Sequence, residues 1–433
     1  MKYHIATFGC QMNEYDSGLL ANLLESVGCQ VTSKKEEADF IFFNTCSIRE
    51  KAEDTAIARI SQIKSLKYKN PNLKIIIVGC MAKNKGKALF KRLPFIDYVI
   101  GPDHYKEIPE IILKQKSYQR VYTEFDETEN YQGAYAKLQT PYSTSIGIQR
   151  GCNKRCSYCI VPYVRGKEKN RDPLDILAEV QSAADRGVSE IMLLGQTVNA
   201  YHKDDFSFAT LLDKISQING IERIRFTSPH PKHYNDELID VLLSNSKICN
   251  HVHLPLQSGS DAILKKMRRQ YNVENFLSIV ERFRNNNPLY AVTTDIISGF
   301  VGETDEDFEQ TLEVVKKAQF DNAFMFIYSP RAGTESFQEK ETLSEEEKQE
   351  RHERLVVIQN EITMQRNKLM FNRNEKILVE RPSTKDPDEW VDKTENFKKV
   401  IFKPTKIVHP GDYVVCHIND IRGWTLRGEV VGE

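Results

Sequence analysis

Three cysteines, Cys152, Cys156 and Cys159, lie within one short polar loop and have the clearest chemical potential in this sequence. Their C-x3-C-x2-C spacing offers three thiolates, too few for a closed tetrahedral zinc site or a fully ligated iron–sulfur cluster. A four-iron cluster held by three thiolates keeps one iron open to a small molecule, and such an iron supports redox chemistry on that molecule. The spacing therefore favours an enzyme with an open-sided cluster.

A structural zinc module is the main alternative for these three cysteines. It would need a fourth Cys or His ligand nearby, and the nearest downstream histidine is His202. Inert cysteines, for their part, have no reason to gather in a polar, basic loop. The ligand count therefore disfavours zinc, although the zinc alternative stays open.

Three further cysteines each end an apolar, strand-like run in the first part of the chain. They are Cys10, Cys46 and Cys80, which end the runs 4–10, 39–46 and 73–80. Right-handed crossovers make such strands parallel, so their carboxyl ends lie at one edge of a sheet, where open α/β folds bind ligands. One such cysteine would be interpreted as core packing, but three in the same position favour a second cluster held by three thiolates.

The elements that must carry these cysteines form an α/β chain of three domains. We expect an N-terminal parallel α/β domain at 1–116, a linker at 117–142, a central partial (β/α)6 barrel at 143–368 and a small C-terminal β-barrel at 369–433. The strands expected in the central domain are 143–149, 190–196, 223–228, 251–257, 291–298 and 322–328. The C-x3-C-x2-C loop follows the first of them, at the strand end where β/α barrels place their chemistry.

Local signals also place helices and the last strands. Asp172 and Pro173 predict the start of a helix and Gly187 its end, while Ser344 with Glu347 forms a capping box. The strands expected in the C-terminal domain are 376–379, 400–402, 413–418 and 426–431. Acidic and basic residues are equally numerous there, so an RNA-binding role and a structural role remain equally open.

Composition limits the partners and the compartment. The 433 residues carry a formal net charge of -1, so the global charge indicates no partner. The sequence has neither a membrane-spanning apolar stretch nor a signal peptide, and its nine cysteines suit metal binding in a reducing compartment better than disulfides. We expect a cytoplasmic monomer that does not enter a membrane. Cys29, Cys249 and Cys416 are interpreted as structural.

Basic residues surround the C-x3-C-x2-C loop. They are Arg150, Lys154, Arg155, Arg165, Lys167, Lys169 and Arg171, opposed by Glu168, with a second group at Lys265, Lys266, Arg268 and Arg269. Such runs are usually solvated faces. Here they could also lower the pKa of the thiols and attract a polyanion such as tRNA, and both interpretations stay open.

The loop, with aromatic Tyr158 before its last cysteine, resembles the radical S-adenosylmethionine (SAM) superfamily. The strand-end cysteines upstream and the small barrel downstream make the whole chain similar to the methylthiotransferases of that superfamily. This resemblance implies two 4Fe–4S clusters. The Cys152, Cys156 and Cys159 cluster would bind SAM and cleave it reductively to a 5′-deoxyadenosyl radical, and the other cluster would hold the sulfur to be inserted. A second SAM would donate the methyl group.

Within that family, three segments resemble the subgroup that converts isopentenyladenosine beside the tRNA anticodon to its 2-methylthio derivative. They are the residues at 44–52, 193–201 and 394–396. The alternatives are methylthiotransferases acting on threonylcarbamoyladenosine in tRNA or on an aspartate of a ribosomal protein. A non-catalytic iron–sulfur protein that binds RNA is the alternative from another class. The resemblance implies as partners the tRNA anticodon stem-loop, a reducing electron donor of flavodoxin or ferredoxin type, and a sulfur donor.

The resemblance also suggests contacts for SAM, although each position has a structural alternative. Gly195 and Gln196 end the second barrel strand, where superfamily members hold the amino group of SAM, or they form a plain turn. Asp295 and Ile297 lie on the fifth strand and are similar to the motif that binds the cofactor adenine, or they pack the barrel. Tyr158 completes this set of candidate cofactor contacts.

Overall fold

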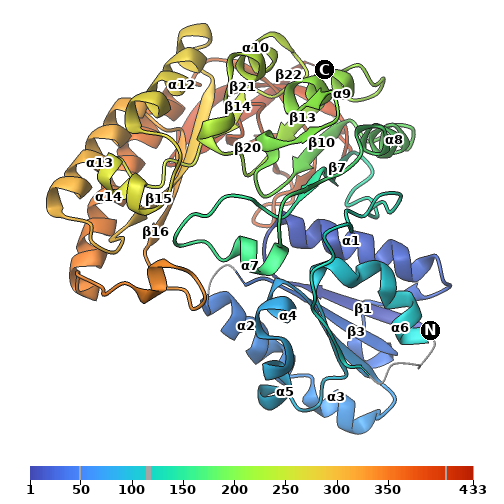
Figure 1. The fold of residues 1–433 in the computed structure, drawn as a ribbon. Coiled ribbons are helices and arrows are strands. Elements are labelled where there is room, and N and C mark those ends of the chain that lie inside the picture. Colours follow the sequence, from blue (N-terminus) through green and yellow to red (C-terminus); the bar gives the residue numbers. More distant parts are fainter. Residues whose placement is uncertain (48–49, 114–118, 405–406, 433) are drawn as a thin grey trace.

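The computed structural model describes residues 1–47, 50–113, 119–404 and 407–432. The N-terminal domain, blue in Figure 1, lies against the central barrel, and the C-terminal sheet, red, packs on another side of that barrel. None of the helices in the described ranges is both long and apolar enough to cross a membrane.

The N-terminal domain is built on a six-stranded sheet in the order β2-β1-β3-β4-β5-β6. Its strands are β1 (Lys2–Thr7), β2 (Gln30–Val31), β3 (Phe40–Thr45), β4 (Lys74–Gly79), β5 (Tyr98–Ile100) and β6 (Val121–Tyr122), and its helices are α1 (Gln11–Glu25), α2 (Glu50–Ser61), α3 (Lys64–Lys69), α4 (Cys80–Lys85), α5 (Leu89–Arg92) and α6 (Ile108–Leu113). Each pairing between these strands is parallel. The three strands that precede the cysteines, β1, β3 and β4, are neighbours, so the cysteines lie at one edge of the sheet as predicted.

One strand of this sheet lies in the segment expected to be a linker. β6 pairs with β5 through Val99 and Val121, and Tyr131, further along, stacks on Tyr105 with 5.9 Å between ring centroids. A two-residue strand has too few residues to show a period, which is why the sequence pattern did not reveal it. The domain boundary expected near residue 116 falls outside the described residues.

The central domain contains the six expected strands, arranged as two parallel three-stranded sheets, β13-β10-β7 and β14-β15-β16. They are β7 (Ser143–Gly147), β10 (Glu190–Leu194), β13 (Arg223–Phe226), β14 (His251–His253), β15 (Ala291–Ser298) and β16 (Asn322–Ile327). A parallel bridge between Ile224 and Ile248 connects the two sheets, which gives an open, partial barrel. Several strands end earlier than expected because the chain turns towards the cavity described below.

Helices cover the outer face of the barrel (Figure 1). They are α8 (Pro173–Ala184), α9 (Phe208–Ser216), α10 (Asp236–Ser244), α11 (Asp261–Lys266), α12 (Val273–Asn286), α13 (Asp305–Ala318) and α14 (Glu345–Lys368). The expected caps are present: the Asp172 carboxylate accepts the backbone N–H groups of Leu174 and Asp175, and Ser344 with Glu347 forms the capping box that opens α14. Leu, Ile, Val and Phe side chains fill the space between helices and strands.

The C-terminal domain is a curled sheet in the order β17-β21-β22-β20-β19-β18. Its strands are β17 (Asn374–Leu378), β18 (Arg381–Pro382), β19 (Trp390–Lys393), β20 (Lys399–Lys403), β21 (Tyr413–Arg422) and β22 (Thr425–Gly432). The four expected strands are present. β18 and β19 were not expected, because they have two and four residues, half of them charged, and are too short to show a period.

Candidate functional site

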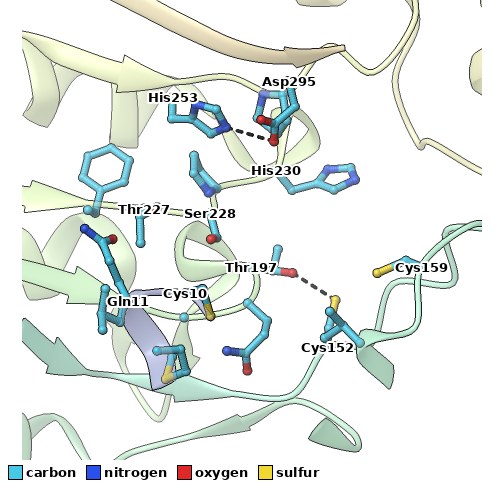
Figure 2. A pocket seen from close by; sticks show the side chains of 18 of the residues that line it. Cys10, Gln11, Cys152, Cys159, Thr197, Thr227, Ser228, His230, His253 and Asp295 are labelled. Carbon is cyan, nitrogen blue, oxygen red and sulfur yellow. Dashed lines mark hydrogen bonds and ion pairs between the residues drawn. The ribbon is translucent and has the colours of Figure 1, made fainter. Parts of the chain in front are cut away.

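A cavity of about 560 Å³ opens between the barrel and the N-terminal domain. Its walls include Cys10 and Cys80 from one domain and Cys152, Cys156 and Cys159 from the other. Figure 2 shows Cys10, Cys152 and Cys159 around this space together with polar residues of the barrel strands. The sixth candidate ligand, Cys46, is buried and interacts with Cys10. Five of the six candidate ligands therefore line one shared space, and the sixth contacts one of the five.

The N-terminal group, Cys10, Cys46 and Cys80, comes from three separate strand ends and is called the trio below. Cys10 is the N-cap residue of α1, and Cys80 is the first residue of α4. A hydrogen bond with Cys46 lowers the pKa of Cys10 to about 6, opposed by burial and aided by the positive charge of Arg165. Burial raises the pKa of Cys80, while Arg165 opposes that shift and donates from Nε to Cys80 Sγ at 3.0 Å.

The barrel group, Cys152, Cys156 and Cys159, lies on one loop and is called the triad below. The Thr197 hydroxyl lies 3.1 Å from Cys152 Sγ, and Arg269 donates from Nη1 to Cys156 Sγ at 3.3 Å. Burial, followed by the neighbouring Cys156 thiol, raises the pKa of Cys159 to about 12. The triad therefore has an electropositive donor of its own.

Glycine is required where the chain enters this loop. Gly151 has φ of +73°, and a Cβ atom there would lie 1.9 Å from the backbone oxygen of Lys167. The loop is also fastened to the turn after α11, because Ser157 donates its backbone N–H to the Met267 carbonyl oxygen at 3.2 Å. The sequence around the triad thus fixes the backbone before any ligand binds.

The arrangement of the thiols fits clusters better than single metal ions. Within the part of the chain that the structure describes, no three Cys, His, Asp or Glu groups are placed to hold one metal ion. A cluster of several irons needs a different arrangement, since each thiolate binds a different iron. Two groups of three thiols, each with an arginine at a sulfur atom, suit 4Fe–4S clusters and disfavour the zinc alternative.

Family models match all three domains. The model described as Radical SAM superfamily matches residues 146–315, the model described as uncharacterized protein family UPF0004 matches 2–101, and the TRAM domain model matches 369–431. A tRNA-2-methylthio-N(6)-dimethylallyladenosine synthase of Thermoanaerobacter sp. is 42% identical over 436 residues, which cover 99% of this chain and 92% of that protein. Proteins of the same name from Corynebacterium urealyticum and Clostridium tetani are each 41% identical and cover 98% and 99% of this chain and 81% and 96% of their own lengths.

The chain belongs to this family of radical SAM enzymes. Its cofactors are those of the family, a 4Fe–4S cluster with SAM and a second cluster.

Solved structures share the fold. The radical SAM methyltransferase TsrM from Kitasatospora setae superimposes with a TM-score of 0.58 at 16% identity, over 75% of this chain and 72% of that one. The cobalamin-dependent radical SAM enzyme OxsB gives 0.56 at 12% identity, over 77% of this chain and 54% of that one. Both structures therefore share the fold over about three quarters of this chain.

The structure places four of the five candidate SAM contacts at the cavity. Tyr158, Gly195, Gln196 and Asp295 line it. Gln196 is already engaged, since its Oε1 accepts the N–H of Gly151 at 2.5 Å, and Asp295 Oδ2 lies 3.2 Å from His253 Nε2. Ile297 is placed differently: its N–H donates to the Gln257 carbonyl oxygen, and its side chain packs beside Phe300.

Aromatic residues that the sequence patterns did not single out form another part of the cavity wall. They are His251, His253, Phe324 and Phe397. The Phe397 ring stacks on His251 with 4.8 Å between centroids, and Phe324 remains 49% exposed although it lies inside the cavity. Phe397 belongs to the C-terminal domain and adopts φ of +61°, which is costly for a bulky residue. We call these four residues the aromatic end of the cavity.

A chain of polar contacts runs behind this aromatic end. Asp295 Oδ2 lies 3.2 Å from His253 Nε2, and the Thr293 hydroxyl lies 3.1 Å from His253 Nδ1 and 2.9 Å from His251 Nε2. Burial, with the nearby Arg225 charge, lowers the pKa of His251 far below its usual value. His251 is therefore neutral, and its ring orientation against Phe397 is fixed.

The basic run around the triad is not the exposed patch that attraction of tRNA would require. Arg150, Arg165 and Arg171 are each at most 4% exposed. Arg171, for example, forms ion pairs with Asp175 and Glu179 at 2.6 Å each. These side chains hold the domains and the barrel together. The members that remain exposed are Arg155, Lys167, Lys265, Lys266 and Arg268.

Proposed function

We propose that this chain replaces the hydrogen at carbon 2 of isopentenyladenosine in tRNA with a methylthio group. One observation carries the proposal: five of the six candidate ligand cysteines line a single cavity, the sixth, Cys46, interacts with Cys10, and an arginine donates to a sulfur atom in each group. Two open-sided clusters at one cavity bring radical generation and sulfur supply to the same substrate atom.

We assign Cys152, Cys156 and Cys159 to the cluster that binds SAM, and Cys10, Cys46 and Cys80 to the auxiliary cluster. When bound, these groups supply the one-electron chemistry that an unactivated ring carbon requires, because no side-chain base can remove that hydrogen as a proton. Arg269 and Thr197 orient the triad thiolates and offset their charge, and Arg165 does so for Cys80. The protein thus contributes position, charge balance and exclusion of water.

Four residues are proposed to contact SAM. Gly195 lines the cavity and packs closely on Gln149 and Val198, where a Cβ atom would lie 3.0 Å from each, while Gln196 connects that position to the loop through Gly151. Asp295 presents a carboxylate to the cavity, and Tyr158 lies between the triad and Phe300. Ile297 supports this wall by packing, a role that needs no contact with the cofactor.

The aromatic end supports an apolar substituent on the adenine. An isopentenyl group is a hydrocarbon, whereas a threonylcarbamoyl group carries a carboxylate that would need a free cation. Among the described residues that line this end, Arg225 is the cation, and its Nη atoms already donate to the backbone oxygens of Thr394 and Glu395 at 3.0 Å. Stacking on Phe324 and Phe397 also suits a base that has left its stack.

tRNA is the proposed substrate because the relatives are named for it and because the chain ends in a TRAM domain. The proposed partners include a low-potential electron donor of flavodoxin or ferredoxin type and a source of sulfur for the auxiliary cluster. The balance requires both: a C–S bond would replace a C–H bond, and one SAM would take an electron from the donor and the hydrogen atom from the ring, leaving as methionine and 5′-deoxyadenosine. The electron released when sulfur bonds to carbon would be taken up by the auxiliary cluster, and a second SAM would donate the methyl group to the sulfur.

An anaerobic assay with reconstituted clusters tests this proposal. Anticodon stem-loops carrying isopentenyladenosine or threonylcarbamoyladenosine are incubated with SAM and a reductant, and nucleosides and cofactor products are measured by mass spectrometry. We expect 2-methylthio product from the isopentenylated RNA, together with 5′-deoxyadenosine. If only the threonylcarbamoylated RNA reacted, the proposed substrate would be wrong. If the protein bound RNA but did not cleave SAM, the result would support the non-catalytic alternative.

A further inference from the structure

Two buried arginines of the barrel domain reach into the loops that carry the auxiliary cysteines. Arg165 ends α7 (Val161–Arg165), the short helix that follows the triad, and Arg331 lies in the loop after β16. Each pairs with a buried carboxylate of the N-terminal domain: Arg165 Nη1 lies 2.7 Å from Asp16, and Arg331 Nη2 lies 2.5 Å from Glu53. The same pattern, a cation from the barrel and an anion from the N-terminal domain, occurs a third time where Lys169 Nζ lies 2.9 Å from Asp103.

Arg165 uses its whole guanidinium group at the trio. Besides its Asp16 contact, it donates from Nε to Cys80 Sγ at 3.0 Å and from Nη2 to Asn13 Oδ1 at 3.1 Å. Cys10 Sγ lies 3.6 Å from the same Asn13 oxygen. Val164, the preceding residue of α7, packs against Cys80. One barrel side chain therefore touches one trio cysteine directly and another through a single amide.

Arg331 performs a similar task at the remaining cysteine. It donates from Nη2 to the backbone oxygen of Ser47 at 2.7 Å and to the Ser47 hydroxyl at 3.1 Å, and Ser47 is the residue directly after Cys46. Ser47 also bonds to Glu53, and Asn84 donates to both at 2.8 and 2.9 Å. The backbone that presents Cys46 is therefore held by a buried network completed from the other domain.

Removing such charges from water costs free energy, so stabilisation of the domain interface alone does not explain these ion pairs. An ion pair removed from water often contributes little net stability, although removing one partner alone costs several kcal/mol. Arg150 is an example of a buried arginine that only joins the two domains. It donates to the Pro102 oxygen and covers the Tyr131 ring, and these contacts do not include a cysteine. What distinguishes Arg165 and Arg331 is their position at the trio.

We propose that Arg165 and Arg331 are positioning residues of the auxiliary cluster, supplied by the barrel, and that Arg165 also raises the reduction potential of this cluster. This inference rests on the proposed assignment of Cys10, Cys46 and Cys80 as cluster ligands. A hydrogen bond to a ligating sulfur stabilises the more negative, reduced state of a cluster, and the charge of Arg165 acts in the same direction. The N-terminal domain provides the thiolates, and the barrel fixes their geometry.

The test uses the full chain in two backgrounds, each able to hold one cluster. The auxiliary-only protein carries Cys152→Ala, Cys156→Ala and Cys159→Ala, and the triad-only protein carries Cys10→Ala, Cys46→Ala and Cys80→Ala. Arg165→Met, Arg165→Lys, Arg331→Met and Arg331→Lys are introduced into both. After anaerobic reconstitution, iron release to a chelator is timed, and the midpoint potential is measured by a titration followed by electron paramagnetic resonance.

We expect the Met variants of the auxiliary-only protein to lose iron about tenfold faster or more, the effect usual for loss of a partner that orients a metal ligand. Arg165→Lys, which keeps the charge but loses the planar donor, is expected to shift the midpoint potential to more negative values. Arg331→Lys should speed iron release without that shift, because Arg331 does not contact sulfur. The triad-only protein should be unchanged by either substitution at residue 331.

Arg354→Met is the matched control, since Arg354 forms an exposed ion pair with Glu309 far from the trio in the fold. Thermal unfolding of each apoprotein shows whether a Met variant is folded. If a Met variant is unfolded, the Lys variant at the same residue is used to test the inference. The inference would be overturned if the rate of iron release and the midpoint potential were unchanged in all folded Arg165 and Arg331 variants. Equal acceleration of iron release in both backgrounds would also overturn it. Absence of iron from the auxiliary-only parent would overturn the inference and the cluster assignment together, whereas iron-loaded unaltered protein that fails to thiolate RNA would overturn the function alone.

Discussion

The triad and the trio each consist of three cysteines at one cavity. The two groups are built in opposite ways. The triad lies on a single loop whose shape is set locally, by Gly151 and by the attachment of Ser157 to the turn after α11. The trio is collected from three strand ends of a parallel sheet and is completed by arginines of another domain. A cluster site can therefore be encoded in a short motif or in a fold, and the second kind depends on the whole molecule.

The largest expected effect separates the two groups by function. Replacing the trio with alanine should leave SAM cleavage but abolish methylthiolation, whereas replacing the triad should abolish both. The reason is that the proposed SAM contacts lie beside the triad, where Gln196 accepts the N–H of Gly151. Release of 5′-deoxyadenosine and formation of the modified nucleoside are measured in parallel. Loss of SAM cleavage in the trio variant would contradict the expected difference in function between the two groups.

Glycine substitutions should damage the two groups separately. Gly151→Ala places Cβ 1.9 Å from a backbone oxygen at the triad, and Gly79→Ala, with φ of +95°, places it 2.5 Å from Asn44 Oδ1 beside the trio. We expect each to cost more than about 3 kcal/mol in unfolding free energy, since steric overlap adds to the backbone strain. Gly28→Ala, also at positive φ but with open space around it, is the control. Iron content and thermal unfolding identify which cluster each variant loses.

Iron removal should destabilise the fold more through the trio than through the triad. A trio cluster would close two loops of about 36 and 34 residues and a triad cluster two loops of about four and three, which makes the loop-closure term of the trio about 4 kcal/mol larger. Denaturant unfolding of the auxiliary-only and triad-only proteins, with and without iron, measures this difference. Equal stabilisation by the two clusters would show that the N-terminal sheet already holds its cysteines rigidly.

The smallest expected effect concerns one hydroxyl group. Thr197→Val removes the contact with Cys152 Sγ, which should weaken iron retention by the triad by about 0.5–1.5 kcal/mol and leave the trio unchanged. Thr128→Val is a suitable control, because the Thr128 hydroxyl contacts the exposed Asp126. Chelator competition in the triad-only protein is sensitive enough to detect this change. An equal change in the auxiliary-only protein would show that the effect of Thr197→Val is not confined to the triad.

Much of the fold was predictable from the sequence because its signals are local. Apolar runs marked the six barrel strands, and their order placed Cys10, Cys46 and Cys80 at one sheet edge, where the structure brings Cys10 and Cys46 into contact. The assignment of these cysteines as cluster ligands stays a prediction. Short or polar strands, such as β6 and β19, had no period long enough to be recognised.

The partners of charged side chains were not predictable, since they come from distant parts of the chain. Lys169 was expected in a basic patch, yet it pairs with Asp103 at 2.9 Å, and Arg165 meets Asp16 across the domain boundary. Charge patterns in a sequence show which residues are ionic but not which are buried. Phe397 was missed for a related reason, because no local pattern indicates that a residue of the last domain reaches the barrel cavity.

Helix α7 also restricts which changes in chain length the molecule can accept. It has five residues and joins the triad to Arg165, so one inserted residue would turn Arg165 by about 100° around the helix axis and away from Cys80. In the exposed segment 124–128, by contrast, an extra residue would add only a few tenths of a kcal/mol in loop closure. α7 thus acts as a spacer of fixed length, and relatives that vary in length are expected to do so elsewhere.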